Sequence, residues 1–533
     1  TALRAGLHEY DERHGWRGSE AKIDLADLPA LPEQTVDADD EALQLVARWT
    51  ALLRPFTAIA GLEPALVVRI GEQDARLLLA SGEQISLNWQ QMQWAKPHID
   101  ADYVGAEPKK TADIFAVGDV VRVRRVATDD GEVWRLAQIP AAQSALIALD
   151  PRNGAVRSLA GGFSFAQSNF NRVIQSQRQA GSALKPFIYT AGLTKGITPA
   201  TLINDAPIVF EDSELETAWR PTGSSNRFYG PTRLREALYR SLNLVSIRLL
   251  QQTGISHTLA TLNDFGLPSE RFQRDLSIAL GSAALSPMEM AAGYSVFANG
   301  GFRITPWFIE RIDNNDNETL WRAPVVMLCD PQCSNGEVAD NSDIAPEDEV
   351  LLPVTGDNTE TRTVQPAPVK ISRAVDARYI WLMDSMLKDV VRRGTAHQAT
   401  QLGRRDLAGK TGTTNEQFDA WFAGYSPALV AAVWVGFDEP ATLGRGEYGG
   451  RAALPIWINY MSTALAGEPD QQMPQPPGIV TARINSTSGK LARPGDADAI
   501  FEYFIEGTVP EQDSEQPMDM GTATEEGEPE HLF

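Results

Sequence analysis

Long apolar runs are missing from this sequence of 533 residues. The longest, Pro427 to Phe437, falls well short of the roughly 20 residues that a membrane-spanning helix needs. We therefore expect the chain as given to be soluble. It begins at Thr1 without a methionine, a charged leader or a cleavage site, so we expect any targeting segment of the natural protein to lie upstream.

Cysteine is almost absent as well. The chain has two, Cys329 and Cys333, in the short sequence CDPQC. No histidine lies near them in the sequence and no second cysteine pair exists, which argues against a zinc site, and we predict no metal or cofactor. The spacing is compatible with a disulfide in an oxidising compartment and with two free thiols in a loop.

Basic residues are in short supply. The 47 lysines and arginines face 70 acidic residues, and the net charge of −23 argues against nucleic acid as a partner. Two segments carry much of the acidity without compensating bases, and both read as solvated chain. We therefore predict an acidic loop at residues 322–370 and an acidic disordered tail at residues 510–533.

The length predicts two or three domains. Residues 1–18 carry a short amphipathic helical pattern closed by glycines, and residues 19–61 read as a linker because part of this segment is rich in proline and acids. Residues 62–140 contain five short runs with a period of two, which predict a small all-β barrel of the OB-like type. Residues 141–509 mix helical patterns with strand-like runs, so we predict an α+β domain.

Three tryptophans fall within the predicted barrel. They could form a binding platform, but in a barrel this small they are more often part of the core. A basic stripe is absent, which again argues against nucleic acid. The tryptophans are Trp89, Trp94 and Trp134.

Common hydrolase motifs are also lacking. The chain has no G-x-S-x-G elbow, no H-E-x-x-H and no Walker loop, and its six histidines lie in no recognisable setting. A Ser-His-Asp enzyme is therefore disfavoured. What is present is a serine followed three residues later by a lysine, which on a helix places both side chains on one face.

This serine–lysine spacing occurs three times, and a single occurrence is a weak signal. Lys-Thr-Gly occurs once. Only one of the three serine–lysine pairs is followed by a Ser-x-Asn and then by Lys-Thr-Gly in a context that makes structural sense. The three pairs are Ser19/Lys22, Ser182/Lys185 and Ser385/Lys388. The selected set is Ser182/Lys185, Ser241/Asn243 and Lys410/Thr411/Gly412.

The neighbours of Ser182 support this choice. Gly181 precedes it and Pro186 follows Lys185, and because proline is tolerated chiefly in the first turn, we expect a helix to begin near Ser182. The Ser182 N–H then lacks an intrahelical partner, and the helix dipole favours developing negative charge there. Ser385 falls in the middle of a predicted helix, where the backbone N–H is already used.

The three motifs, and the text around them, resemble the transpeptidase domain of bifunctional class A penicillin-binding proteins. The stretches that carry the resemblance are RQAGSALKPFIY, LREALYRSLN and LAGKTGTTN, together with SLAGG, FANGG and GTAHQA. The resemblance extends over roughly residues 141–505. Residues 1–18 are similar to the end of the glycosyltransferase domain of this family, and the barrel resembles the domain inserted in the 1a-type proteins of Gram-negative bacteria.

The resemblance implies the penicillin-recognising transpeptidase fold, an antiparallel sheet flanked by helices. It also implies a peptidoglycan D,D-transpeptidase that acts on D-Ala-D-Ala stem peptides and is a target of β-lactams. The glycosyltransferase catalytic part and the membrane anchor are expected outside this chain, so we predict that the chain does not polymerise glycan. The expected location is the periplasmic face of the inner membrane.

Roles for the motif residues follow from the chemistry and agree with the resemblance. Ser182 is predicted to be the nucleophile and Lys185 its unprotonated base, kept neutral by desolvation or by the charge of Lys410. Ser241 is predicted to pass the proton to the leaving amine, and Asn243 to orient the substrate amide and Lys185. Taken singly, Ser241 could instead be a helix cap, Asn243 a turn residue and Lys410 a surface cation.

The Lys-Thr-Gly segment is predicted to bind substrate. Thr411 and Thr413 would hold the terminal carboxylate, and the Thr413 backbone N–H would join that of Ser182 in an oxyanion hole. Gly412 would let the substrate lie along the strand.

Two alternatives remain open at this point. One is a β-lactamase or D,D-carboxypeptidase that uses water as the acceptor, although position 242 is Leu rather than the Asp of S-D-N. The other is a silent β-lactam-binding sensor. The resemblance favours diaminopimelate as the acceptor amine and an outer-membrane lipoprotein activator as the partner of the barrel.

Overall fold

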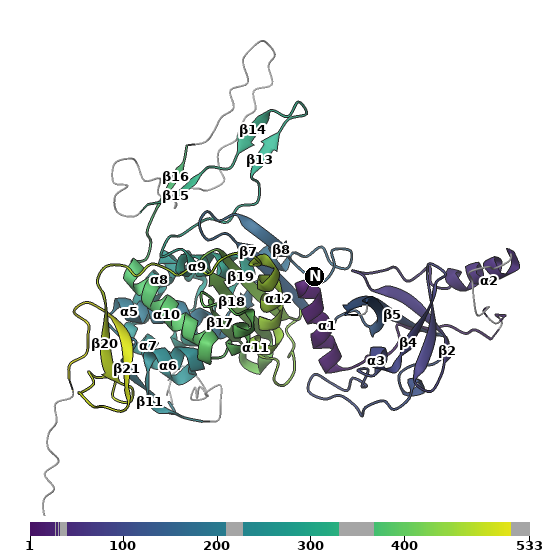
Figure 1. Cartoon of the computed structure of the whole chain (residues 1–533), viewed down its shortest axis with the longest axis horizontal. Coiled ribbons are helices and arrows are strands. Elements are labelled where there is room, and N and C mark those ends of the chain that lie inside the picture. The colour runs from purple at the N-terminus through teal and green to yellow at the C-terminus, as the bar shows by residue number, and fades with distance from the viewer. Residues whose placement is uncertain are drawn as a thin grey trace, which may run out of the picture.

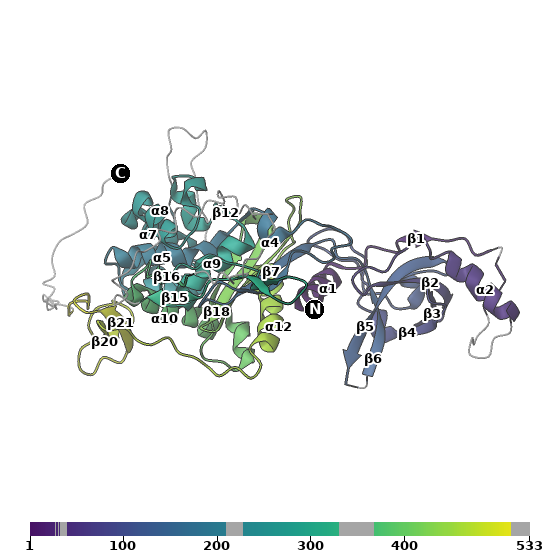
Figure 2. The same cartoon turned by 90° about the horizontal axis from the view of Figure 1, so that it is seen from above.

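The computed structural model describes residues 1–26, 28–29, 31, 40–129, 131–208, 227–329 and 367–512. A small barrel lies at one end of the molecule and a larger α+β body at the other (Figures 1 and 2). Most of the predicted acidic loop and of the predicted tail lies outside the described residues, whereas Gln512, within the predicted tail, forms a β-bridge with Leu491. Within the described part, no helix combines the length and apolar character needed to cross a membrane.

The barrel is a six-stranded antiparallel sheet in the order β1-β5-β2-β3-β4, with β6 paired to β5. Alternating apolar residues of β2, β3 and β5 point inward and form its core, as the period of two predicts. Trp89, Trp94 and Trp134 pack against this core, as expected of structural side chains. The elements are β1 (Ala21–Lys22), β2 (Glu63–Ile70), β3 (Asp74–Leu79), β4 (Gln84–Asn88), α3 (Trp89–Met92), β5 (Asp119–Thr128) and β6 (Gly131–Ala137).

Part of the predicted linker at residues 19–61 packs on the barrel. Strand β1 pairs with β5, and helix α2 (Asp40–Ala51) brings Trp49 against the buried side chains Leu66 and Leu78. The linker prediction rests on the proline-rich stretch before residue 40 and misses the amphipathic segment that follows it. The domain boundaries themselves stay predictions.

Helix α1 (Ala2–His14) lies between the two bodies (Figure 1). Its apolar side packs on α12 and β7 of the larger body, and the Tyr10 hydroxyl donates to the carbonyl of Leu443 at 2.8 Å. On the barrel side, Glu12 forms ion pairs with Arg124 at 3.4 Å and Arg135 at 2.7 Å. The first helix therefore contacts both bodies.

The larger body is built on a five-stranded antiparallel sheet in the order β17-β18-β19-β7-β8. Strands β7, β18 and β19 are buried along their whole length, whereas β17 forms one edge. The bounds are β7 (Gln143–Leu149), β8 (Val156–Ala160), β17 (Ala408–Thr413), β18 (Asp419–Ser426) and β19 (Leu429–Gly436).

Helices cover both faces of this sheet. Two side chains of β18 on opposite faces show this: Tyr425 donates to Asp384 of α10, whereas Phe422, three positions earlier, meets Trp457 of α12 edge to face. Figure 2 shows α9 and α12 on opposite sides of the strands. The helices are α4 (Arg172–Gln175), α5 (Lys185–Thr194), α6 (Leu234–Arg240), α7 (Asn243–Thr253), α8 (Ile255–Asp264), α9 (Pro287–Ala298), α10 (Ala377–Arg393), α11 (Gly449–Ala452) and α12 (Leu454–Ala464).

Short two-stranded pairings complete the larger body. The hairpin β20–β21 lies beside α6 and α10, and β13–β14 projects from the body (Figure 1). The pairs are β9 (Arg178–Gln179) with β12 (Ala284–Leu285), β10 (Leu202–Asp205) with β11 (Gly230–Arg233), β13 (Arg311–Asp313) with β14 (Thr319–Arg322), β15 (Val326–Cys329) with β16 (Val369–Ser372), and β20 (Ile479–Asn485) with β21 (Ala499–Ile505). Cys329 ends β15, and Cys333 lies outside the described residues.

Candidate active site

Ser182 lies in a short 3-10 helix, η2 (Gly181–Leu184), that runs directly into α5. Pro186 occupies the first turn of α5, as the sequence predicts. Gly181 has a φ of +53°, and a Cβ at this position would lie 2.6 Å from the carbonyl oxygen of Thr413. Glycine is therefore required here, and it brings half-buried Ser182 to the edge of β17.

Lys185 is fully buried one turn after Ser182. Its Nζ donates to the carbonyl oxygen of Ser241 and to Oδ1 of Asn243, each at 2.8 Å, and lies 3.4 Å from the Ser241 hydroxyl. Burial and then the nearby charge of Lys410 lower the pKa of Lys185 well below its usual value, whereas Asp205 opposes this shift. The environment therefore favours a neutral amine.

Ser241 is the residue at which α6 ends, and its backbone is left-handed with a φ of +61°. Non-glycine residues rarely adopt this conformation, which costs on the order of 1 kcal/mol. The turn places the Ser241 hydroxyl 2.9 Å from Nζ of Lys410. Asn243 begins α7, so the Ser-x-Asn motif spans the junction of two helices.

Lys410 extends from β17 and is fully buried. Besides contacting Ser241, its Nζ donates to the carbonyl oxygen of Thr411 at 3.0 Å. Burial lowers the pKa of Lys410 to about 7. The alternative of a surface cation is therefore wrong for this residue.

The rest of β17 faces η2. A Cβ on Gly412 would lie 2.6 Å from the carbonyl oxygen of Ala180, so glycine permits this close approach. The N–H of Thr414 donates to Asp419 on β18. Because successive N–H groups of a strand alternate in direction, the N–H of Thr413 points to the free edge of the sheet.

Two contacts hold the threonine hydroxyls of β17. Oγ1 of Thr411 lies 2.7 Å from Oγ1 of Thr395, and Oγ1 of Thr413 accepts from the N–H of Gly449 at 3.0 Å. The sequence motifs assign no role to Thr395 or Gly449. Thr395 falls within the GTAHQA stretch, whereas Gly449 has no local sequence signal.

The other two serine–lysine pairs have different surroundings. The hydroxyl of Ser385 donates to the carbonyl of Leu382 at 2.7 Å, in the middle of α10, and Lys388 is paired with Asp384 at 2.7 Å. Ser19 lies in a loop before β1, and Lys22 is exposed. Neither of these pairs contacts a second lysine through a serine hydroxyl in the described part of the chain.

The described residues contain no group of three or more His, Cys, Asp or Glu side chains arranged to hold a metal ion. The site is instead a set of hydroxyls, amines and one amide. The motif residues from three distant segments of the sequence meet between η2, the α6–α7 junction and the edge strand β17.

Three family models match the chain in succession. Residues 144–462 match the penicillin binding protein transpeptidase domain, and residues 16–142 match the penicillin-binding protein OB-like domain. Residues 475–516 match the C-terminal domain of penicillin-binding protein 1A. The chain belongs to the penicillin-binding protein family.

Known proteins called penicillin-binding protein 1A are similar over almost the whole chain. The Pseudomonas aeruginosa protein is 44% identical over 97% of this chain and 61% of its own length, and the Escherichia coli protein is 35% identical over 100% of this chain and 65% of its own length. The chain thus spans less than two thirds of these relatives. A crystal structure of penicillin-binding protein 1A from Haemophilus influenzae superposes with a TM-score of 0.77, at 35% identity, over 96% of this chain and 70% of that one.

These similarities confirm the resemblance to 1a-type penicillin-binding proteins that the motifs indicated. They also confirm the α+β transpeptidase fold with an OB-like domain. The chain is a transpeptidase-type penicillin-binding protein, as predicted. The matched OB-like segment begins at residue 16, and β1 and α2 fall inside it.

Proposed function

We propose that the chain is a serine D,D-transpeptidase that cross-links peptidoglycan stem peptides and is acylated by β-lactams. The observation that carries the proposal is the position of the Ser241 hydroxyl between two buried lysines, 2.9 Å from Lys410 and 3.4 Å from Lys185. Ser241 and the two lysines form a proton-transfer system. One of these lysines, Lys185, lies one turn after half-buried Ser182 at the helix start.

Acylation begins at Ser182. Neutral Lys185 accepts the hydroxyl proton as the Ser182 oxygen bonds to the carbonyl carbon of the penultimate D-Ala, and the carbonyl oxygen becomes an oxyanion. The backbone N–H groups of Ser182 and Thr413 would stabilise this oxyanion. In the described residues the Ser182 N–H donates to no backbone carbonyl, so it is available for this role.

Collapse of the intermediate breaks the peptide bond. The leaving amine of D-Ala receives a proton from the Ser241 hydroxyl, which is replenished by protonated Lys185. The acyl group then remains on Ser182 as an ester. An acceptor amine attacks this ester, gives up its proton through the same groups, and restores the free Ser182 hydroxyl. With a β-lactam the broken bond is the ring amide, and the leaving amine stays tethered.

Substrate would dock along the free edge of β17. An extended peptide can add to an exposed edge through backbone hydrogen bonds, and Gly412 lets η2 lie close beside this edge. Thr411 and Thr413 would bind the terminal carboxylate, and protonated Lys410 would supply the positive charge for it. The hydroxyl of Thr395, 2.7 Å from that of Thr411, orients this binding group.

The identity of the acceptor separates this proposal from its rivals. We expect D-Ala release from a stem pentapeptide to yield a cross-linked product when an amine acceptor is supplied. Hydrolysis alone would indicate a D,D-carboxypeptidase, and a persistent acyl-enzyme without turnover would indicate a sensor. Mass spectrometry of the products with and without the amine distinguishes the three.

We further propose that the whole protein acts at the periplasmic face of the inner membrane and uses diaminopimelate as the acceptor amine. A membrane anchor and a glycosyltransferase would belong to the parts of the relatives that this chain does not span. The OB-like domain contributes no motif residue and is free to dock an outer-membrane lipoprotein activator. Binding of such a lipoprotein to the isolated chain, lost on removal of the barrel, tests this assignment.

A further inference from the structure

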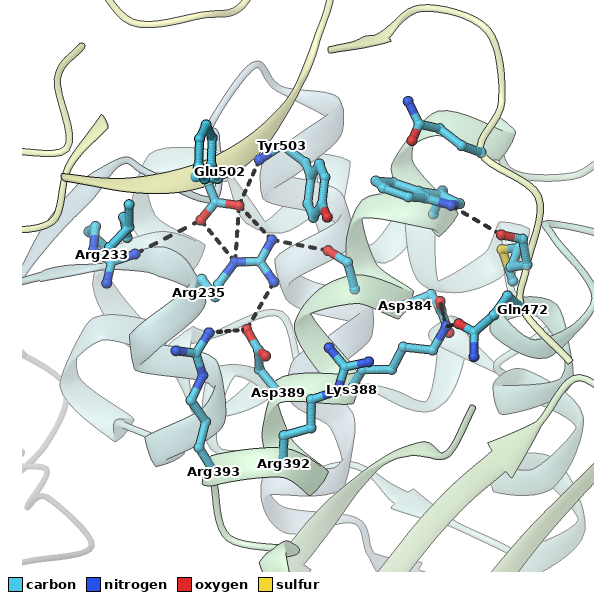
Figure 3. Close-up of a pocket in the computed structure, with 16 residues that line it drawn as sticks. Arg233, Arg235, Asp384, Lys388, Asp389, Arg392, Arg393, Gln472, Glu502 and Tyr503 are labelled. Atoms are coloured by element: carbon cyan, nitrogen blue, oxygen red, sulfur yellow. Dashed lines mark hydrogen bonds and ion pairs between the residues drawn. The ribbon is translucent and has the colours of Figure 1, made fainter. Parts of the chain in front are cut away.

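A cavity of about 450 Å³ opens on the larger body between α6, α10 and the strand β21 (Figure 3). None of the motif residues of the candidate active site lines it. Its lining includes five basic and three acidic side chains, in a chain whose total charge is strongly negative. The charged lining residues are Arg233, Arg235, Asp384, Lys388, Asp389, Arg392, Arg393 and Glu502.

Each of the three carboxylates in the cavity already has a basic partner. Glu502 is bound by Arg235 at 2.6 Å, and Asp389 is bound by Arg235 at 3.1 Å and by Arg393 at 2.6 Å. Asp384 is paired with Lys388 at 2.7 Å. Figure 3 shows this network joining the helices to the hairpin. The carboxylates therefore have little capacity left for a cationic ligand.

Among the described residues, exposed Arg392 is the lining cation without a close carboxylate partner, and its charge acts on Asp384 at longer range. It forms no ion pair with any described residue, and its only hydrogen bond is a long one, 3.5 Å, to the carbonyl oxygen of Arg405. In Figure 3 no dashed line reaches its side chain. A guanidinium carries several donors in a planar fork that matches a carboxylate, so the unused capacity of this cavity is that of an anion receptor.

Aromatic side chains form another wall. The rings of Trp381 and Tyr503 meet edge to face with their centres 4.9 Å apart, and the side chain of Phe501 is 77% exposed. These groups offer apolar surface in the same cavity as the guanidinium. Inorganic phosphate has no apolar part that could cover this aromatic surface. A monoanion with a hydrocarbon or peptide body fits better than inorganic phosphate.

We propose that this cavity is a second ligand site that binds the terminal carboxylate of a peptide, with Arg392 as the anion receptor and Trp381 and Tyr503 against the peptide body. The site goes beyond the proposed transpeptidase chemistry, because it lies apart from Ser182 and performs no covalent step.

The test blocks the active site before measuring binding. The chain is treated with a penicillin, one adduct per chain is verified by mass spectrometry, and N-acetyl-D-alanyl-D-alanine is then titrated by calorimetry. We expect saturable one-to-one binding that weakens at least tenfold in Arg392→Gln. Arg405→Gln is the matched control, since this exposed arginine lies next to the cavity without lining it, and it should bind like the wild type.

Several results would overturn the proposal. They are the absence of saturable binding to the acylated chain, equal binding by Arg392→Gln and the wild type, and tighter binding of inorganic phosphate than of the peptide. Acylation is recorded separately by mass, so a failure of the serine mechanism is distinguishable from a failure of this site. A Ser182→Ala chain keeps its active site open to the same peptide, so Arg392→Gln in that background should remove only the part of the binding that belongs to the cavity.

Discussion

The hydroxyl of Ser241 lies 2.9 Å from Nζ of Lys410, although the two residues are 169 positions apart in the sequence. The contact joins the end of α6 to the edge strand β17, and it depends on the left-handed backbone of Ser241. Through this contact, and through the approach of Lys185 to the same serine, all three motifs form one connected group.

The first prediction concerns the nucleophile, for which the chain supplies its own controls. A penicillin should add one drug mass per chain, and peptide mapping should place it on the fragment with Ser182. Ser182→Ala should abolish the adduct because no oxygen remains to be acylated. Ser19→Ala and Ser385→Ala should leave the yield unchanged. An adduct on Ser385, or one that survives Ser182→Ala, contradicts the assignment.

The second prediction concerns the base. Lys185→Ala should slow acylation by several orders of magnitude, because the oxyanion-binding N–H groups persist while the proton acceptor is gone. Stopped-flow acylation by a chromogenic β-lactam measures the rate. Lys388→Ala removes the lysine of the second pair and serves as the control. A Lys185→Ala rate within tenfold of the wild type would exclude this role.

The third prediction is a pH profile. Acylation needs neutral Lys185 and charged Lys410, and the pKa of Lys410 is lowered to about 7. The second-order acylation constant, which reports the free enzyme, should therefore fall as the pH rises above about 7. A bound carboxylate raises the pKa of Lys410, so the first-order rate at saturating β-lactam should persist to higher pH. If the second-order constant and the first-order rate fall at the same pH, Lys410 does not bind the carboxylate.

The fourth prediction concerns stability. Between about pH 7 and 10.5 the unfolded chain still holds the Lys410 proton while the folded chain has released it, so this group makes the free energy of unfolding rise with pH. The shift from 10.5 to about 7 corresponds to about 5 kcal/mol. Lys410→Met should flatten this slope and raise the melting temperature at pH 7 while acylation is lost. Denaturant titrations at pH 7 and pH 9 measure the slope, and an unchanged slope would be a contrary result.

The fifth prediction concerns Thr395, which contacts Thr411 and not the nucleophile. Thr395→Val removes one hydroxyl at nearly constant volume and should weaken binding of the β-lactam carboxylate severalfold, with a smaller effect on the rate at saturation. Thr395→Ser keeps the hydroxyl and should restore affinity. If Val and Ser variants behave alike, the hydroxyl contact does not position Thr411.

The sequence predicted the order of the two bodies, the helix start at Ser182 and the grouping of the three motifs. Motif order and proline position are local signals, and they suffice for these features. The sequence could not predict that Ser241 is left-handed, because nothing in SLN requires a positive φ; the conformation belongs to the turn between α6 and α7. Nor could it predict the contact of Gly449 with Thr413, which depends on how α11 lies over β17 and β18.

Helix α2 is another element whose packing the sequence could not predict. Its residues follow proline-rich sequence that is typical of a linker, but Trp49 of the helix, and Leu53 just after it, become buried against the outside of the barrel. An amphipathic pattern indicates that a helix needs a partner without indicating which surface provides it.

Helix α1 connects the two bodies through ion pairs on both of its sides. Glu12 holds its barrel side through two arginines, and on the other side Arg13 pairs at 2.7 Å with Glu447, two positions before the glycine that anchors the Thr413 hydroxyl. If the barrel tilts, either the ion pairs of Glu12 break or α1 moves with the barrel. In the second case the movement of α1 is passed through Arg13 and Glu447 to the loop beside the edge strand. The orientation of the barrel is therefore coupled to the shape of the substrate groove.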